Sequence, residues 1–320
     1  MKNWNDLPHE MKEMVAMEMG FITRARLKQC SKSDKFLIES LPMELNRVAV
    51  SWKAQSPYHD PILCLKIDDL TLVNQNSCVR VYMGEEDLQV VSFKSNDEAS
   101  AFVMNIFINT IFNKKNKMEY LKINNVTYPF TNKTPQYPIK AKRINFKKMS
   151  AENGKEWLQH IKTDIDAIRI SYRDVEWDKL QRIASNSVVN RAKQLELAHS
   201  FITDNEMINF KATDLTIVSQ NLTYNGVNRL IKNWIKNDYP IESMFNIQLP
   251  FSPEKAQIMD GIDFDVIREA GLKAQDVMKM QVEMTEEKYM ELIIMSTSVR
   301  YNHQNLDNYI KIEATIKPWY

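Results

Sequence analysis

The feature that most constrains the fold is a short strand-like pattern that recurs from about residue 118 onwards. Each occurrence carries two apolar residues at positions i and i+2, as in Tyr120–Ile123, Arg143–Phe146, Ala167–Ile170, Gln194–Leu197, Asp214–Ile217 and Met244–Ile247. The steps are 23, 24, 27, 20 and 30 residues when measured from Leu121, Ile144, Ile168, Leu195, Leu215 and Phe245. Helical patterns lie between the strands, most clearly at Glu152–Ile161, Trp177–Ser185 and Thr223–Asp238.

A strand followed by a helix every 20–30 residues is typical of a leucine-rich-repeat solenoid. One such unit cannot bury its apolar face alone, so the units stack and their strands form a parallel sheet. The repeats here are irregular and lack the asparagine ladder of the standard motif. We therefore favour an irregular leucine-rich-repeat-like solenoid, and an ordinary α/β domain with parallel strands stays open as the alternative.

The segment before the repeats predicts a small antiparallel meander. Alternating apolar residues run through residues 62–94, and Asn74–Ser77 and Gly84–Asp87 supply turns. A helix is expected to follow from Asn96 to about Phe112, whereas residues 51–61 are predicted to form a linker.

The C-terminal residues predict a strand cap. Met290–Arg300 and Tyr309–Ile316 have strand patterns, and such strands cover the open edge of a solenoid. Phe264–Val282 is expected to be helical.

The first forty residues predict three short helices. Leu7, Met11, Met14, Val15 and Met19 recur at helical spacing, with Asp6 as the expected N-cap and Gly20 as the expected C-cap. The second and third helices are expected at Thr23–Cys30 and Ser33–Ser40. A unit this small buries little apolar surface alone, so it needs a partner or serves as a helical cap on a larger domain.

These residues resemble the F-box, the module that docks a substrate receptor onto a Skp-family adaptor. The resemblance rests on Leu7-Pro8, on Cys30-Ser31-Lys32, and on the form R-x-x-L-x-x-C-S-K-x-D-K, which is similar to that of the large nematode F-box family. The chain departs from the family at Asp34, where a Trp is usual. The resemblance implies that the adaptor-binding residues are Leu7, Pro8, Met11, Val15, Met19, Leu27, Cys30 and Phe36.

A second resemblance lies in residues 222–250. Val227–Lys236 and Ile241–Ile247 are similar to the helix and strand of the F-box-associated type 2 domain of nematode proteins, although Asn237-Asp238 stands where that family often has Gly. Together the two resemblances imply an α/β (α+β overall) protein: an N-terminal three-helix F-box, then a small antiparallel meander and an irregular leucine-rich-repeat-like solenoid. The expected domains are residues 1–50, 51–113 and 114–320.

In a solenoid strand the residues that alternate with the apolar pair line the concave face. This rule predicts a substrate-binding face that contains Tyr120, Lys122, Arg143, Asn145, Arg169, Ser171, Arg173, Glu196, Thr216, Asn246 and Gln248.

Charge is unevenly distributed along a chain whose formal net charge is +1. Residues 113–148 hold ten Lys or Arg and one acid, whereas residues 254–291 hold ten acids and five bases. The basic stripe favours an acidic or phosphorylated protein substrate. A solvated convex surface is the plainer interpretation. A third interpretation of the stripe is that it binds nucleic acid. Aromatic residues interleave with the stripe, but no RNP, KH or zinc-finger pattern accompanies them.

The sequence shows no catalytic or cofactor motif that we would assign. It lacks GxSxG, HExxH, GxxxxGK[ST] and GxGxxG, and its five histidines have no metal-ligand spacing. We therefore expect no cofactor, no metal and no catalysis. Three cysteines, Cys30, Cys64 and Cys78, fit a reducing compartment, and neither a signal peptide nor a membrane span is expected, which predicts a cytoplasmic or nuclear protein.

Three functions follow as hypotheses. The first is a substrate receptor of a Skp–cullin–F-box ubiquitin ligase, reaching cullin and RING protein through the adaptor. The second is an interaction scaffold without a ligase, in which Leu7, Met11 and Met19 pack against the strands after residue 62. The third is an enzyme of unrecognised type, which would need a deep polar pocket with converging titratable groups.

Overall fold

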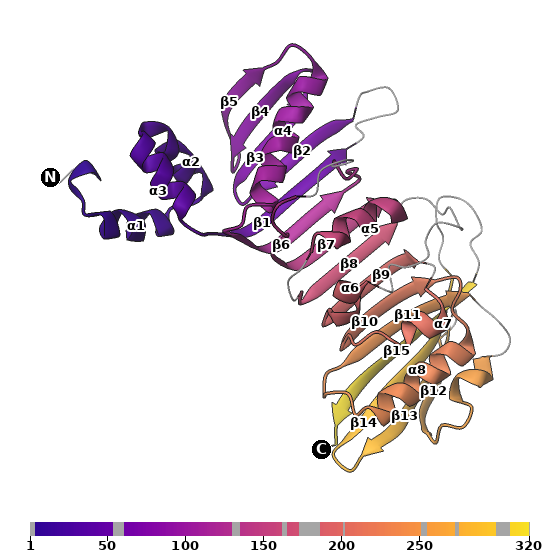
Figure 1. Cartoon of the computed structure of the whole chain (residues 1–320). Helices are drawn as coiled ribbons and strands as arrows, with labels where there is room; N and C mark the ends of the chain where they lie inside the picture. Colours follow the sequence, from indigo (N-terminus) through magenta and orange to yellow (C-terminus); the bar gives the residue numbers. More distant parts are fainter. Residues whose placement is uncertain are drawn as a thin grey trace. The chain divides into compact units, whose positions relative to one another are not determined.

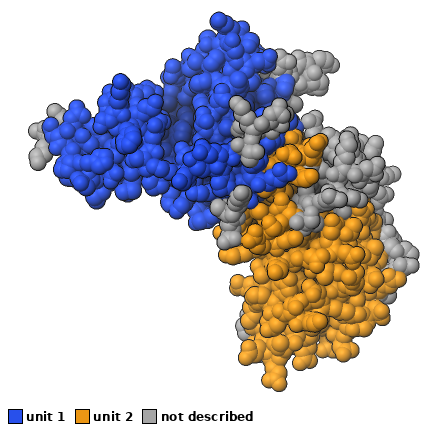
Figure 2. Space-filling view, viewed as in Figure 1, with its two compact units in different colours: residues 1–147, 159–163 blue, residues 148–158, 164–320 orange. Residues whose placement is uncertain are grey.

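The computed structural model divides the chain into two compact units. Unit 1 comprises residues 1–147 and 159–163, and unit 2 comprises residues 148–158 and 164–320 (Figure 2). The structure describes residues 4–53, 61–129, 135–161, 165–172, 186–200, 202–250, 255–272, 275–298 and 308–319. The predicted helix at Trp177–Ser185 and the candidate Arg173 lie outside the described residues.

Unit 1 begins with three short helices, as the sequence predicts. They are α1 (His9–Glu18), α2 (Phe21–Cys30) and α3 (Lys32–Ser40), preceded by the 3-10 turn η1 (Trp4–Asp6). The predicted caps of the first helix are wrong. Pro8 has an extended ψ of 154°, so α1 starts after it rather than at Leu7. Met19 is the C-cap of α1, and Gly20, which is extended as well, is the N-cap of α2. Only these two residues separate the first two helices.

The sheet of unit 1 has the order β5-β4-β3-β2-β1-β6-β7. Its strands are β1 (Met43–Lys53), β2 (Ile62–Ile67), β3 (Leu70–Gln75), β4 (Cys78–Met83), β5 (Glu86–Ser92), β6 (Asn116–Asn124) and β7 (Ala141–Met149). The antiparallel meander β2–β5 is confirmed. The helix α4 (Asn96–Ile111) contacts β2, β3 and β4, with Ser95 as its N-cap (Figure 1).

The strand β1 is a feature that the sequence analysis missed. It pairs antiparallel with β2 and parallel with β6, and it includes Ser51–Lys53, which the sequence analysis assigned to a linker. Its parallel neighbour follows some seventy residues later, after the meander and α4, so no regular step in the sequence reveals it.

The sheet of unit 2 has the order β8-β9-β10-β11-β15-β14-β13-β12. Its strands are β8 (Ala167–Tyr172), β9 (Gln194–Ser200), β10 (Asp214–Ser219), β11 (Met244–Pro250), β12 (Asp265–Leu272), β13 (Gln275–Thr285), β14 (Lys288–Ser298) and β15 (Asn308–Pro318). Its helices are α5 (Ala151–Gln159), α6 (Ser187–Arg191), α7 (Asp204–Met207), α8 (Tyr224–Lys236) and the 3-10 turn η2 (Lys255–Met259). Neither sheet closes into a barrel.

The strands β8 to β11 are parallel, and β15 then covers the edge of β11 in antiparallel orientation. This cap agrees with the sequence prediction for the last strands. The expected helix at Phe264–Val282 is wrong, because these residues belong to β12 and β13. Met280 and Val282 are buried and alternate with more exposed neighbours, which is the period of a strand.

Each of the six predicted strand cores lies in a strand, and β1 adds a further member. Six of these seven strands share a third buried residue, three positions before the apolar pair, which gives the spacing i, i+3, i+5. The buried triplets are Leu45/Val48/Val50, Met118/Leu121/Ile123, Ala141/Ile144/Phe146, Ile165/Ile168/Ile170, Ala192/Leu195/Leu197 and Ala212/Leu215/Ile217. Figure 1 shows the helices that follow the first three on one side of the strands of each unit. Successive side chains of a strand point to opposite faces, so the polar residues that alternate with the buried pairs share the other face, here called the helix-free face.

Candidate binding surfaces

The N-terminal helices surround a very small core. Ala16, Leu37 and Ile38 are its buried residues, and the partly buried Trp4, Leu27 and Leu41 pack against them. A core of this size leaves much of the apolar surface of three helices uncovered.

Arg24 holds the helices together from inside. Its buried guanidinium donates to the carbonyl oxygens of Met17 (2.8 Å), Met19 (3.0 Å) and Pro42 (2.6 Å). Burial lowers the pKa of Arg24 from its usual value. The guanidinium therefore ties the end of α1 to the chain that leaves α3, and it is a structural group rather than a binding one.

Asp34 of α3 is buried and its carboxylate accepts hydrogen bonds. The Trp4 indole Nε1 donates to its Oδ1 (2.8 Å) and the Ser31 hydroxyl to its Oδ2 (2.7 Å). The bonds from Trp4 and then Ser31 lower the pKa of Asp34 below 3.8. The Trp4 side chain thus ties η1 to the first turn of α3.

Large apolar side chains are exposed on α1 and α3. These exposed apolar side chains are Met11, Met14, Val15, Met17 and Phe36, with Phe36 75% and Met14 65% exposed. Of the predicted adaptor-binding residues, Pro8, Met11, Val15, Cys30 and Phe36 are exposed, whereas Leu7, Met19 and Leu27 are partly buried. The sequence list omitted Met14 and Met17, although Met14 follows Met11 at helical spacing.

The helix-free face of unit 1 is built from rows of side chains that cross β1, β6 and β7. Arg47, Tyr120 and Arg143 are in register, and the next rows are Ala49, Lys122 and Asn145, then Ser51, Asn124 and Lys147. On the other side of β1, Lys66 pairs with Ala49. The face therefore joins the predicted residues Tyr120, Lys122, Arg143 and Asn145 to cations that the sequence analysis did not select.

Six cations define this basic face: Arg47, Lys53, Lys66, Lys122, Arg143 and Lys147. Among the described residues, no carboxylate forms an ion pair with any of the six. The carboxylate of Asp68 instead accepts the backbone N–H of Arg47 (2.8 Å). Burial, followed by repulsion from Lys147, Arg47 and Lys53, lowers the pKa of Lys122 from 10.5. The like charges are therefore close enough to oppose one another.

Tyr120 lies at the centre of the first row and is already engaged. The Arg47 guanidinium lies over its ring, 5.7 Å from the centroid, and the Asn145 Nδ2 donates to its hydroxyl (3.1 Å). The ring is thus fixed by its neighbours in the sheet.

The helix-free face of unit 2 has the same alternation, but most of the charged residues that the structure describes on it are in ion pairs. Arg169 forms an ion pair with Glu196, and Lys311 forms one with Glu313. Glu291 bonds both Lys279 (2.6 Å) and Lys317 (2.8 Å). The other predicted residues on this face are the partly exposed Ser171, Thr216, Asn246 and Gln248.

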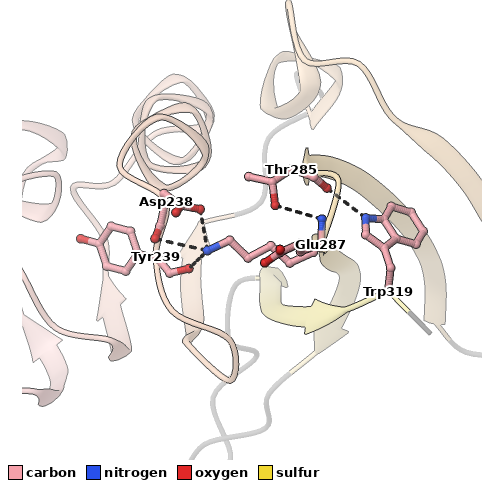
Figure 3. A network of polar contacts seen from close by, with 6 residues as sticks. Asp238, Tyr239, Thr285, Glu287 and Trp319 are labelled. Carbon is pink, nitrogen blue, oxygen red and sulfur yellow. Dashed lines mark hydrogen bonds and ion pairs between the residues drawn. The ribbon is translucent and has the colours of Figure 1, made fainter.

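A further polar network in unit 2 joins the end of α8 to the turn between β13 and β14 (Figure 3). The buried Lys288 ammonium contacts the Asp238 carboxylate (2.5 Å) and donates to the carbonyl oxygens of Asp238 (3.3 Å) and Tyr239 (2.8 Å). Beside it, the Trp319 indole donates to the Thr285 carbonyl (3.1 Å). The donors of this network bond acceptors within it, so we assign it a structural role.

Within the ranges that the structure describes, no three His, Cys, Asp or Glu side chains converge in a way that could hold a metal ion. None of the described helices combines the length and the apolar character that a membrane crossing requires.

No protein-family model, no curated protein and no solved structure matches this chain.

Proposed function

We propose that this protein is the substrate-recognition subunit of a Skp–cullin–F-box ubiquitin ligase. In this proposal the N-terminal helices bind the Skp-family adaptor, and the helix-free faces of the sheets present a target protein for ubiquitin transfer. The protein acts by holding its target at high local concentration and forms no bond itself.

The observation that carries the proposal is the concentration of exposed apolar side chains on α1 and α3. Five of the eleven large exposed apolar side chains among the described residues lie on these two helices, which contain nineteen residues. Exposed apolar surface on a small unit favours a partner that covers it. The scaffold hypothesis places Leu7, Met11 and Met19 against the strands, and the 50% exposure of Met11 favours the docking proposal over it.

The buried spacing i, i+3, i+5 supports a leucine-rich-repeat-like solenoid as the receptor part of the proposal. It is the L-x-x-L-x-L spacing of that repeat, and it recurs in parallel strands of both units. In repeat proteins of this class the side opposite the helices is the common binding surface.

The test is a binding assay with a purified Skp-family adaptor. Met14→Ala with Phe36→Ala removes exposed side chains without touching the core of the helices, so we expect at least a tenfold loss of affinity. The matched control is Leu88→Ala with Val90→Ala, which removes two exposed apolar side chains of β5 in the same unit.

The control pair should bind the adaptor as the unaltered chain does, and circular dichroism should show unchanged helix content in both. Deletion of residues 1–40 should abolish the complex in size-exclusion chromatography and leave β1 intact, since β1 begins at Met43. An adaptor that ignores the unaltered chain, or binds the Met14/Phe36 variant equally well, would remove the docking assignment.

A further inference from the structure

Four cations of the basic face surround two small side chains of β1. Along β1, Arg47 and Lys53 lie two residues before Ala49 and two residues after Ser51. Across the sheet, Lys66 of β2 and Lys122 of β6 lie on either side of Ala49. We call this set the cation ring.

The four residues flank Ala49 and Ser51, with Lys66 and Lys122 on the two neighbouring strands and Arg47 and Lys53 at the two ends of this stretch of β1. Neighbouring strands are about 4.8 Å apart and alternate residues along a strand are about 6.7 Å apart. The backbone positions of Lys66 and Lys122 are therefore about 10 Å apart across Ala49, and those of Arg47 and Lys53 are about 20 Å apart along β1. The Ser51 hydroxyl between them adds a hydrogen-bond donor.

The pKa shifts of Lys122 and Cys64 are consistent with repulsion between the positive charges of the cation ring. Burial, followed by repulsion from Lys147, Arg47 and Lys53, lowers the pKa of Lys122. Burial raises the pKa of Cys64, which lies opposite Ser51, and the positive charges of Lys53 and Lys66 oppose that rise. Among the described residues, no carboxylate pairs with a member of the cation ring, whereas most of the charges on the corresponding face of unit 2 are paired. An anion that entered the ring would supply the missing countercharge.

We propose that the cation ring binds an anionic side chain of an extended protein segment. This inference rests on the proposed function, because it names the class of target that the receptor takes. Alternate side chains of an extended segment point the same way about 6.7 Å apart, so acidic groups at alternate positions match the rows of the basic face. A carboxylate and a phosphoryl group offer the same chemistry to the ring.

The state of Tyr120 favours a protein segment over nucleic acid. Single-stranded nucleic acids are held by bases stacked on open aromatic rings, in addition to cations. The aromatic ring of Tyr120, at the centre of the first row of the basic face, instead lies under the Arg47 guanidinium, and its hydroxyl is held by Asn145.

The experiment measures fluorescence anisotropy of labelled probes with the full chain. The probes are a twelve-residue polyglutamate peptide, its polyglutamine counterpart, a phosphoserine peptide of the same length and a twelve-nucleotide oligothymidylate. We expect the two anionic peptides to bind and polyglutamine not to bind, with affinity that falls steeply as salt is raised. The peptide of higher affinity identifies whether carboxylate or phosphoryl groups are preferred.

The variant Lys66→Gln with Lys122→Gln should weaken peptide binding about tenfold, since it removes two charges of the ring. The matched control, Arg169→Gln with Lys311→Gln, removes the same charge from the paired face of unit 2 and should change affinity less than threefold. A second variant, Ser51→Asp, places a carboxylate inside the ring and should abolish peptide binding while the fold is kept.

If both double variants lost peptide affinity equally, the net charge of the protein would explain the binding and the proposed site would be wrong. The failure of both anionic peptides to bind, or a tighter, ring-dependent interaction with oligothymidylate, would also overturn the site. Adaptor binding by the same variants separates this result from the proposed function, because Lys66→Gln with Lys122→Gln should leave the adaptor complex intact. If the unaltered chain binds the anionic peptides but not the adaptor, that result contradicts the proposed function and leaves the peptide site standing.

Discussion

The helix-free faces of the two units share a strand pattern but differ in how their charges are balanced. In unit 1 the six cations of the basic face have no carboxylate partner among the described residues. In unit 2 most of the described charges are in ion pairs, such as Arg169 with Glu196 and Glu291 with Lys279. The same backbone arrangement can therefore give a face that is satisfied by itself or one that lacks countercharge.

The difference teaches where to look for a ligand. Paired surface charges add little stability and leave little to offer a partner. Unpaired like charges cost stability in the free protein, and a partner that neutralises them removes that cost. The inward faces should show no such contrast, because both units bury apolar side chains at the same spacing.

The largest expected effect tests this equivalence of the inward faces. Phe146 in unit 1 and Phe245 in unit 2 are almost fully buried. Phe146→Ala and Phe245→Ala should each lower the free energy of unfolding by about 3–5 kcal/mol. Urea titration with peptide-level hydrogen exchange would locate each loss in its own unit. The control Phe36→Ala, at an exposed site, should lower the free energy of unfolding by less than about 0.5 kcal/mol. A loss at Phe36 as large as those at Phe146 and Phe245 would refute the assignment of the core.

An intermediate effect is expected at Lys288, whose charge is buried and paired in unit 2. Lys288→Met leaves the carbonyl oxygens of Asp238 and Tyr239 without their donor and should lower the free energy of unfolding by about 1–3 kcal/mol. The control Asp238→Asn should cost less than about 1 kcal/mol, because the Asp238 side chain is mostly exposed. Thermal unfolding measures both, and equal losses would show that the ion pair rather than the carbonyl contacts matters.

The smallest effects are pH-dependent and opposite in the two units. Burial raises the pKa of Glu291, but hydrogen bonds from Lys279 and Lys317 outweigh it and hold the pKa below 4.5. Its contribution to stability is therefore present above the unfolded pKa and lost as pH falls through the lowered value. The pKa of Lys122 is below 10.5 in the folded state, so its charge destabilises unit 1 fully below the lowered pKa, and stability rises as pH approaches 10.5.

Unfolding free energies of the unaltered chain, Glu291→Gln and Lys122→Gln across acidic and alkaline pH would measure both terms. Glu291→Gln should remove part of the acid-side loss. Lys122→Gln should remove the alkaline rise and stabilise the protein at neutral pH by less than about 1 kcal/mol. A destabilised Lys122→Gln variant would show that the basic face carries no repulsion and would weaken the contrast between the units.

Much of the fold was predictable from the sequence. The apolar pairs at i and i+2 identified the six strand cores, and the turn residues identified the meander. The error at Phe264–Val282 arose because these residues alternate weakly and contain several charges, and pairing with neighbouring strands decides their conformation. The strand β1 was missed because its parallel partner lies beyond the meander and α4.

The candidate surfaces were predictable only in part. Helical spacing in the sequence indicated Met11 and Val15, and alternation indicated Tyr120, Lys122 and Arg143. Which apolar residues stay exposed depends on the packing of three helices, so Leu27 went into the core while Phe36 stayed outside.

By itself the sequence determined most of the strands and helices and the polarity of the faces of the repeated strands, because apolar periodicity is a local property of the chain. Only the tertiary structure decided that Arg47, Lys53 and Lys66 join Lys122 on one face. That assembly depends on the register between β2, β1 and β6, which hydrogen bonding and the burial of the inward side chains fix together. Residues far apart in the chain thereby become neighbours, and no local pattern records it.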